Sequence, residues 1–277
     1  MAEIAKTSVE DIELSLFLEG IFRRYGYDFR DYAPASLQRR IRKCMRDEQL
    51  HTVSALQDRV LHDPAAMQRF LHTVSIDVTA MFRDPTFYCA FRQRVVPLLR
   101  SQPSLRIWHA GCAAGEEVYS MAILLQEEGL SERSRLYATD MNTLGLDKGK
   151  AGIFRLKAMQ GYTENYQKAG GKRSFSEYYS ARYDHAIFQD SLKQNIVWAE
   201  HNLVTDRSFN EFQVILCRNV LIYFNQSLQK RVHKLLYESL ALQGILALGS
   251  KETLQFTPYA DCFESLDDRE KIFRKVK

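Results

Sequence analysis

An apolar run that leads through a glycine-containing turn into a helix constrains the fold of this chain more than any other feature. Residues 105–110 read Leu-Arg-Ile-Trp-His-Ala, and Gly111, Gly115 and the acids Glu116 and Glu117 follow them. The run predicts a strand. In the turn, small residues remove side-chain obstruction, so backbone N–H groups can approach a ligand. The same residues could also form only a tight strand-to-helix turn.

Beyond Pro103, short β-rich runs alternate with helical stretches, which predicts an α/β fold with a parallel sheet and crossover helices. Residues 155–194 interrupt this alternation, and we expect them to form an insertion or small subdomain. Residues 262–276 predict a closing hairpin. We expect strands at 105–110, 135–139, 195–199, 212–217 and 244–250, and helices at 116–128, 142–151 and 226–241.

Up to about Arg100 the pattern is helical and carries one basic cluster. Residues 23–46 hold eight basic side chains against two aspartates, whereas residues 1–22 hold five acids and one lysine. The apolar residues Leu37, Ile41 and Cys44 form one stripe of an amphipathic helix. The basic residues off that stripe, which form either a solvated face or a docking surface, are Arg39, Arg40, Arg42, Lys43 and Arg46.

Composition excludes several classes of protein. The 277 residues carry a net charge of +4 and are 45% hydrophobic, as in ordinary globular proteins. No apolar run approaches the ~20 residues of a membrane helix, and no secretory signal is visible, so we expect a cytoplasmic protein without membrane insertion. The five cysteines form no CxxC pair and the histidines show no HExxH spacing, so we expect no metal.

Two acidic features favour a cofactor with a cationic centre and a ribose. Glu116 and Glu117 would repel a phosphate, and Asp140 stands at the end of the next expected strand, where Rossmann-like folds bind ribose hydroxyls. S-adenosylmethionine fits this pattern better than a dinucleotide. Alternatively, Asp140 could be the N-cap of the following helix.

A later strand ends in polar residues that suit the reacting end of such a site. Arg218 and Asn219 follow the apolar run at 214–217, and Tyr223 comes soon after. The Asn/Asp-Pro-Pro-aromatic tetrapeptide common in amino-group methyltransferases of nucleic acids is absent here. Arg218 could also be a surface cation at the strand end and Tyr223 a core residue.

At these residues the sequence resembles the CheR-type chemoreceptor glutamate methyltransferases from about residue 15 to the end. The matching motifs are Thr79-Ala-Met-Phe-Arg83, Ala-Ala-Gly-Glu-Glu-Val-Tyr-Ser at 113–120, Ala138-Thr-Asp140, Gly152-Ile-Phe-Arg155, His201-Asn-Leu203 and Cys217-Arg-Asn-Val-Leu-Ile-Tyr-Phe224.

The resemblance implies a Rossmann-like class I methyltransferase sheet with an N-terminal all-α domain and a small inserted antiparallel β subdomain. It implies a helical domain at 1–75, a linker at 76–103 that contributes to the cofactor site, and a methyltransferase domain at 104–277.

It also implies S-adenosyl-L-methionine as cofactor and S-adenosyl-L-homocysteine as product. Arg83 and Tyr223 are the candidate catalytic residues. One position departs from the family pattern, because Asp77 stands where the family usually has Asn. The implied cofactor-binding residues are Asp77, Thr79, Arg83, Glu117, Asp140, Asn202, Leu203, Arg218 and Asn219.

The implied activity is methyl transfer to glutamate carboxylates on the cytoplasmic helical domain of chemoreceptors, with the basic cluster as docking surface. The hairpin at 178–188 lacks the glycine of members that bind a receptor's C-terminal peptide, so we expect no dependence on such a peptide. We expect a monomer that binds no nucleic acid. The alternatives are a methyltransferase acting on nucleic acid or a small molecule, or a non-catalytic receptor-binding module.

Overall fold

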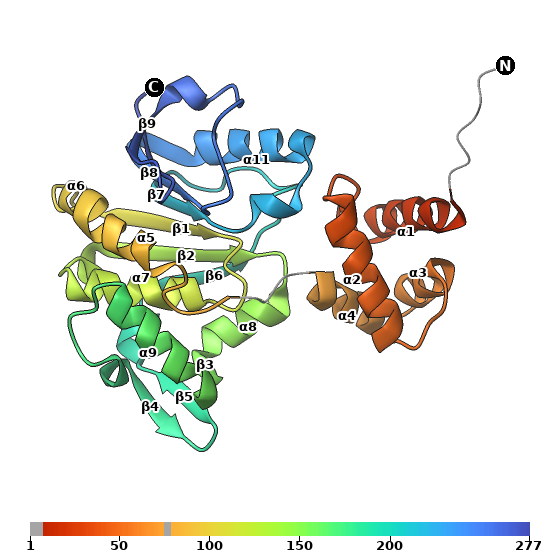
Figure 1. The fold of residues 1–277 in the computed structure, drawn as a ribbon, viewed down its shortest axis with the longest axis horizontal. Coiled ribbons are helices and arrows are strands. Elements are labelled where there is room, and N and C mark those ends of the chain that lie inside the picture. Colours follow the sequence, from red (N-terminus) through yellow and green to blue (C-terminus); the bar gives the residue numbers. More distant parts are fainter. Residues whose placement is uncertain (1–7, 75–78) are drawn as a thin grey trace. The chain divides into compact units, whose positions relative to one another are not determined.

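The computed structural model describes residues 8–74 and 79–277 (Figure 1). The chain forms two compact units. Of the described residues, 8–74 belong to the first unit together with 223–229, and 79–222 belong to the second together with 230–277. No helix among the described residues has the length and apolar character needed to cross a membrane.

Four helices make up most of the first unit: α1 (Val9–Tyr25), α2 (Pro34–Asp47), α3 (Val53–His62) and α4 (Pro64–Val74). Their starts follow from the sequence. The side chains of Ser8 and Thr52 accept backbone N–H bonds at the N-caps of α1 and α3, and prolines open α2 and α4. The predicted stripe of α2 is buried at Leu37, Ile41 and Cys44.

Residues 223–229 pack against the N-terminal helices within this first unit. The backbone N–H of Ala33 donates to the Tyr223 carbonyl at 2.8 Å, and the rings of Tyr32 and Phe224 meet edge to face at 5.0 Å. The Arg40 guanidinium lies over the Tyr223 ring, 4.6 Å from its centroid. A segment distant in sequence therefore completes the helical unit.

The second unit is built on a seven-stranded sheet with the order β6-β2-β1-β7-β8-β10-β9. The first five strands in this order are parallel, as the alternation predicted, and β10 and β9 close the sheet as the expected antiparallel hairpin. The strands are β1 (Leu105–Ala110), β2 (Ser134–Asp140), β6 (Ile196–Glu200), β7 (Phe212–Cys217), β8 (Leu240–Leu248), β9 (Phe263–Asp267) and β10 (Ile272–Lys275).

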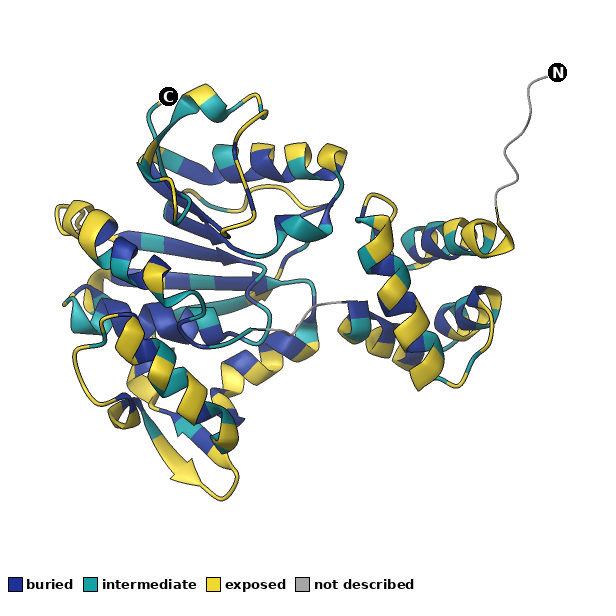
Figure 2. Cartoon of the chain, in the orientation of Figure 1, coloured by how far each residue is buried: buried dark blue, intermediate teal, exposed yellow. Residues whose placement is uncertain are grey.

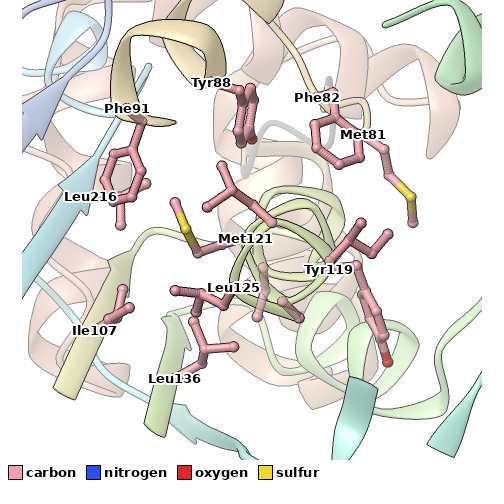
Figure 3. Close-up of a cluster of buried hydrophobic side chains, with 14 of the residues drawn as sticks. Met81, Phe82, Tyr88, Phe91, Ile107, Tyr119, Met121, Leu125, Leu136 and Leu216 are labelled. Carbon is pink, nitrogen blue, oxygen red and sulfur yellow. The ribbon is translucent and has the colours of Figure 1, made fainter. Parts of the chain in front are cut away.

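Helices α7 (Glu116–Glu127), α8 (Thr143–Ala151) and α11 (Gln226–Ser239) follow β1, β2 and β7 along the chain. Helix α7 is buried along most of its length (Figure 2). Its Met121 and Leu125 pack with side chains of the sheet and with the aromatic residues of 81–91, where helix α5 (Pro85–Ala90) lies (Figure 3). This cluster is the main core of the unit.

The interruption at 155–194 is the expected inserted subdomain with a small antiparallel sheet. Strands β3 (Ile153–Arg155), β5 (His185–Phe188) and β4 (Tyr179–Arg182) pair antiparallel in that order, and helix α9 (Met159–Lys168) lies between β3 and β4 in the chain. A Cβ at Gly171 would lie 2.2 Å from the Tyr166 ring, so only glycine allows this close packing.

Buried Glu127 ties the inserted subdomain to α7. Its carboxylate accepts hydrogen bonds from the hydroxyls of Tyr166 and Tyr178, from the Lys172 backbone N–H and from Arg92. Burial by itself raises the pKa of Glu127, but these donors outweigh burial and hold the pKa below its usual value.

Candidate active site

Several candidate cofactor residues of the second unit lie at or after the carboxyl ends of neighbouring parallel strands. Strand β1 lies between β2 and β7, and β6 lies beside β2. Asp140 ends β2 and pairs in register with Glu200, the last residue of β6. The glycine turn follows β1, Arg218 and Asn219 follow β7, and Asn202 follows β6. Ligands bind at this edge of open α/β sheets, where the strand order reverses.

The glycine turn and Asp140 form one hydrogen-bonded unit. Gly111, Ala113 and Gly115 have φ of 80°, 50° and 92°, and a Cβ at Gly115 would lie 2.5 Å from the Trp198 ring. The Ala113 N–H donates to Asp140 Oδ2 at 2.9 Å. The turn is therefore a shaped loop that a strand-end carboxylate holds in place.

Asp140 is not the N-cap of α8. That cap is Asn142, whose side chain accepts from the Gly145 N–H, while Asp140 Oδ1 accepts from the Asn142 N–H at 2.9 Å. The alternative role considered for Asp140 is therefore wrong.

Glu117 is the centre of a buried charged cluster. Its Oε1 lies 3.0 Å from His109 Nδ1, and its Oε2 accepts from Arg218 at 3.2 Å. Burial alone would raise the pKa of Glu117, but the hydrogen bond from His109 and the charge of Arg218 hold it below its usual value. The carboxylate thus remains ionised beside the glycine turn.

Arg218 joins this cluster to the segment that carries Arg83. Its guanidinium also pairs with Asp84 at 3.1 Å and lies over the Phe87 ring, 3.9 Å from the centroid. Only 3% of the Arg218 side chain is exposed, so the surface-cation alternative is wrong.

Arg83 lies between two residues with left-handed backbone. Phe82 and Asp84 have φ of 51° and 55°, a conformation that costs free energy in residues other than glycine. The Phe82 N–H donates to the Ser120 hydroxyl at 2.8 Å, and Asp84 binds Arg218. These contacts fix the backbone on both sides of Arg83, which is half-buried.

The remaining cofactor candidates lie before Arg83 in the chain and after strand β6. Thr79 is half-buried, and Asp77 lies outside the described residues. Asn202 uses its side-chain oxygen to accept from the Val204 N–H at 3.0 Å, and Leu203 is 8% exposed. The preceding residue, His201, donates its backbone N–H to the Asp140 carbonyl at 3.2 Å, which joins the two strand ends.

The expected docking surface on α2 needs one correction. Arg40 is buried, and its guanidinium donates to the Val74 carbonyl at 2.8 Å and contacts the Tyr223 ring. It therefore stabilises the helical unit and is not available for docking. The exposed basic residues of α2 are Arg39, Arg42, Lys43 and Arg46.

Sequence reasoning missed Asp84, His109, Ser120 and Glu252 as supporting residues. Asp84 could have been suspected, because it is the only acid next to Arg83. Asp84 directly precedes α5, but its side chain makes no cap bond to that helix and instead pairs with Arg218. Nothing in the local sequence indicated the partners of the other three.

The residues at the sheet edge fit an adenosine-containing cofactor. Asp140 is an acceptor beside a turn without bulky side chains, and Glu117 adds an ionised carboxylate. The sheet order and the site define a class I methyltransferase. A comparison with solved structures matches the N-methyltransferase NodS from Bradyrhizobium japonicum in complex with S-adenosyl-L-homocysteine at a TM-score of 0.41 and 14% identity, over 72% of this chain and 90% of that chain.

Sequence comparison identifies the family. Residues 77–271 match the CheR methyltransferase SAM binding domain, and residues 12–75 match the CheR methyltransferase all-alpha domain. The relative Cher3 from Pseudomonas putida is 53% identical and covers 96% of this chain and 97% of its own. A chemotaxis protein methyltransferase from Listeria innocua is 26% identical, and the match covers 86% of this chain and 88% of the Listeria protein.

This chain belongs to the CheR methyltransferase family. The predicted Rossmann-like sheet, the N-terminal all-α domain and S-adenosyl-L-methionine as cofactor are confirmed.

Proposed function

We propose that this protein transfers the methyl group of S-adenosyl-L-methionine to glutamate side chains on the cytoplasmic helical domain of chemoreceptors. The observation that carries the proposal is the Glu117–Arg218–Asp84 cluster, which joins the cofactor-type edge of the sheet to the segment bearing Arg83. Membership of the CheR family supports this choice of substrate.

The reaction needs no general base. A glutamate side chain has a pKa of about 4.3 in water and is already ionised at neutral pH. The cofactor supplies an electrophilic methyl group on a sulfonium sulfur. The ionised glutamate carboxylate would take this methyl group directly, and S-adenosyl-L-homocysteine would leave with the electron pair of the former sulfur–carbon bond, so that the two opposite charges cancel. The protein contributes alignment and electrostatic stabilisation.

Each site residue has a proposed role in this reaction. Asp140 binds the ribose hydroxyls, and Asn202 and Leu203 flank the adenine. Arg83 and Tyr223 orient the substrate carboxylate. Arg83 is proposed to contact the cofactor as well, and the other residues proposed to line the cofactor site are Asp77, Thr79, Glu117, Arg218 and Asn219.

Docking of the receptor is proposed to use the exposed basic residues of α2. A helical bundle that presents several glutamates is acidic, so a positive helix face would steer and orient it. We propose further that the protein acts in the cytoplasm as a monomer. We also propose that it needs no C-terminal receptor peptide, because the β4–β5 turn contains no glycine.

Two variants test the roles of the site residues. Arg83→Ala should nearly abolish methyl transfer to receptor fragments, because the substrate carboxylate loses its cation. Asp140→Ala should chiefly weaken S-adenosylhomocysteine binding, measured by calorimetry. Turnover like that of the wild type in Arg83→Ala would refute its assignment. Arg94, an exposed arginine of the same segment, provides the matched control as Arg94→Ala.

A further inference from the structure

Glu252 is a buried carboxylate with no role in the reaction described above. It follows β8 and is 4% exposed. Its Oε1 accepts from the backbone N–H groups of Val220 and Leu221 at 2.8 and 2.7 Å. Its Oε2 accepts from those of Asn219 and Gly249 at 3.0 and 2.5 Å. One side chain therefore binds four backbone donors.

Burial raises the pKa of Glu252, and the four backbone N–H donors oppose this shift because they favour the carboxylate form. Its two oxygens are both acceptors, whereas the amide of glutamine would direct an NH₂ donor at two of the N–H groups. The backbone that Glu252 binds is strained at Asn219, which has a left-handed φ of 62°. A Cβ at Gly249 would lie 2.8 Å from the Asn219 nitrogen, so the loops after β7 and β8 are in close contact.

The segment held by Glu252 contacts the cofactor turn directly. A Cβ at Gly111 would lie 2.7 Å from Val220 Cγ2, so the Val220 side chain packs against the first residue of the glycine turn. Gly111 in turn donates its N–H to the Thr139 carbonyl at 2.9 Å, next to Asp140. A contact path thus runs from Glu252 through Val220 to the turn.

We propose that Glu252 is a positioning residue for cofactor binding. By fixing the backbone of 219–221, it sets Asn219 in its left-handed conformation and holds Val220 against Gly111. This inference rests on the proposed cofactor site, but it does not depend on which substrate is methylated. Its effect should therefore appear in the affinity for S-adenosylhomocysteine, without any receptor present.

Calorimetry with S-adenosylhomocysteine tests the proposal on the full chain. Glu252→Gln should weaken binding by about tenfold or more, because two N–H groups then face a donor. Glu211→Gln is the matched control, since Glu211 is exposed at the opposite end of the β7 strand and should bind like the wild type. In transfer assays, KM for S-adenosylmethionine should rise while KM for the receptor fragment stays constant.

A second variant keeps the test decisive if Glu252→Gln does not fold. Val220→Ala leaves all four bonds to Glu252 in place and removes only the contact with Gly111, so binding should weaken by about threefold or more in a folded protein. Wild-type affinity in folded Glu252→Gln, or in Val220→Ala, would overturn the proposal. A lowered melting temperature with unchanged affinity would show a structural role only. If the wild type fails to methylate receptor fragments, the proposed substrate is refuted, but the binding measurements still test the role of Glu252.

Discussion

Arg218 pairs with both carboxylates of the buried cluster, Glu117 and Asp84, so its removal should destabilise the folded protein. Arg218→Ala would leave Glu117 and Asp84 without their shared cation. Breaking a buried ion pair in this way typically destabilises a protein by about 3–5 kcal/mol. We expect a loss of this order in the free energy of unfolding, measured by urea denaturation.

Arg274→Ala is the control for that experiment. Its pair with Glu264 is partly exposed, so the expected loss is at most about 1 kcal/mol. Equal, small losses in the two variants would contradict the account of the buried cluster.

His233 should make stability depend on pH. It is 3% exposed, and burial lowers its pKa from 6.5 to about 4. Between these values the unfolded chain binds a proton that the folded protein does not, so the free energy of unfolding falls as the pH decreases. The loss from pH 7 to below pH 4 approaches about 3 kcal/mol, at about 1.4 kcal/mol for each pKa unit.

The variant His233→Gln isolates this effect. Urea denaturation of both proteins at several pH values should show a flatter dependence in the variant between about pH 6.5 and 4. Identical slopes for the wild type and the variant would contradict the assigned direction of the pKa shift.

At the residue scale, the sequence predicted the side chains that follow a strand but not their partners. Asp140 and Arg218 could be placed because strand ends are visible in the apolar pattern. The burial of Arg40 could not be predicted, because it depends on the Val74 carbonyl of another helix and on Tyr223, far away in the sequence. Periodicity assigns a side chain to a helix face but does not show which partners cover that face.

At the element scale, helix α2 carries buried Arg40, which stabilises the helical unit, and exposed basic residues that we propose as the docking surface. The double variant Arg39→Glu/Arg46→Glu reverses two exposed charges, so it should fold normally but methylate the receptor more slowly than the wild type. The difference in rate should be largest at low salt. Arg40→Ala should instead lower the free energy of unfolding, since a buried carbonyl and an aromatic ring lose their partner. Initial rates at several salt concentrations and denaturation curves measure the two effects.

The paired variants distinguish docking from stability. If the double charge reversal methylates receptor fragments at the wild-type rate at every salt concentration, α2 is a solvated face and not a docking surface. If it also unfolds more easily, the rate must be compared at a temperature where both proteins are folded.

The elements themselves were largely predictable. Strands β1 and β7 have the expected bounds, because each is a short apolar run whose ends are visible in the sequence. Strand β8 begins earlier than expected, at Leu240, because the sheet pairing of its first residue with Phe212 extends it before Gly244. Register of this kind is a tertiary property that the local sequence does not contain.

At the scale of the whole molecule, the alternation of strands and helices predicted a parallel sheet but not its strand order. Likewise, no sequence pattern indicated that residues 223–229 belong to the compact unit formed by the N-terminal helices. Contacts such as Ala33 to Tyr223 join segments far apart in the chain, and no local pattern indicates them.

The central claim is that this protein forms methyl esters on receptor glutamates. Its direct test is the transfer of tritiated methyl groups from S-adenosylmethionine to receptor cytoplasmic fragments, followed by mild base. The account predicts that the label is incorporated, that base releases it as methanol, and that fragments with glutamine in place of the methylated glutamates incorporate none. Label that resists base, or no incorporation by a protein that binds S-adenosylhomocysteine, would contradict it.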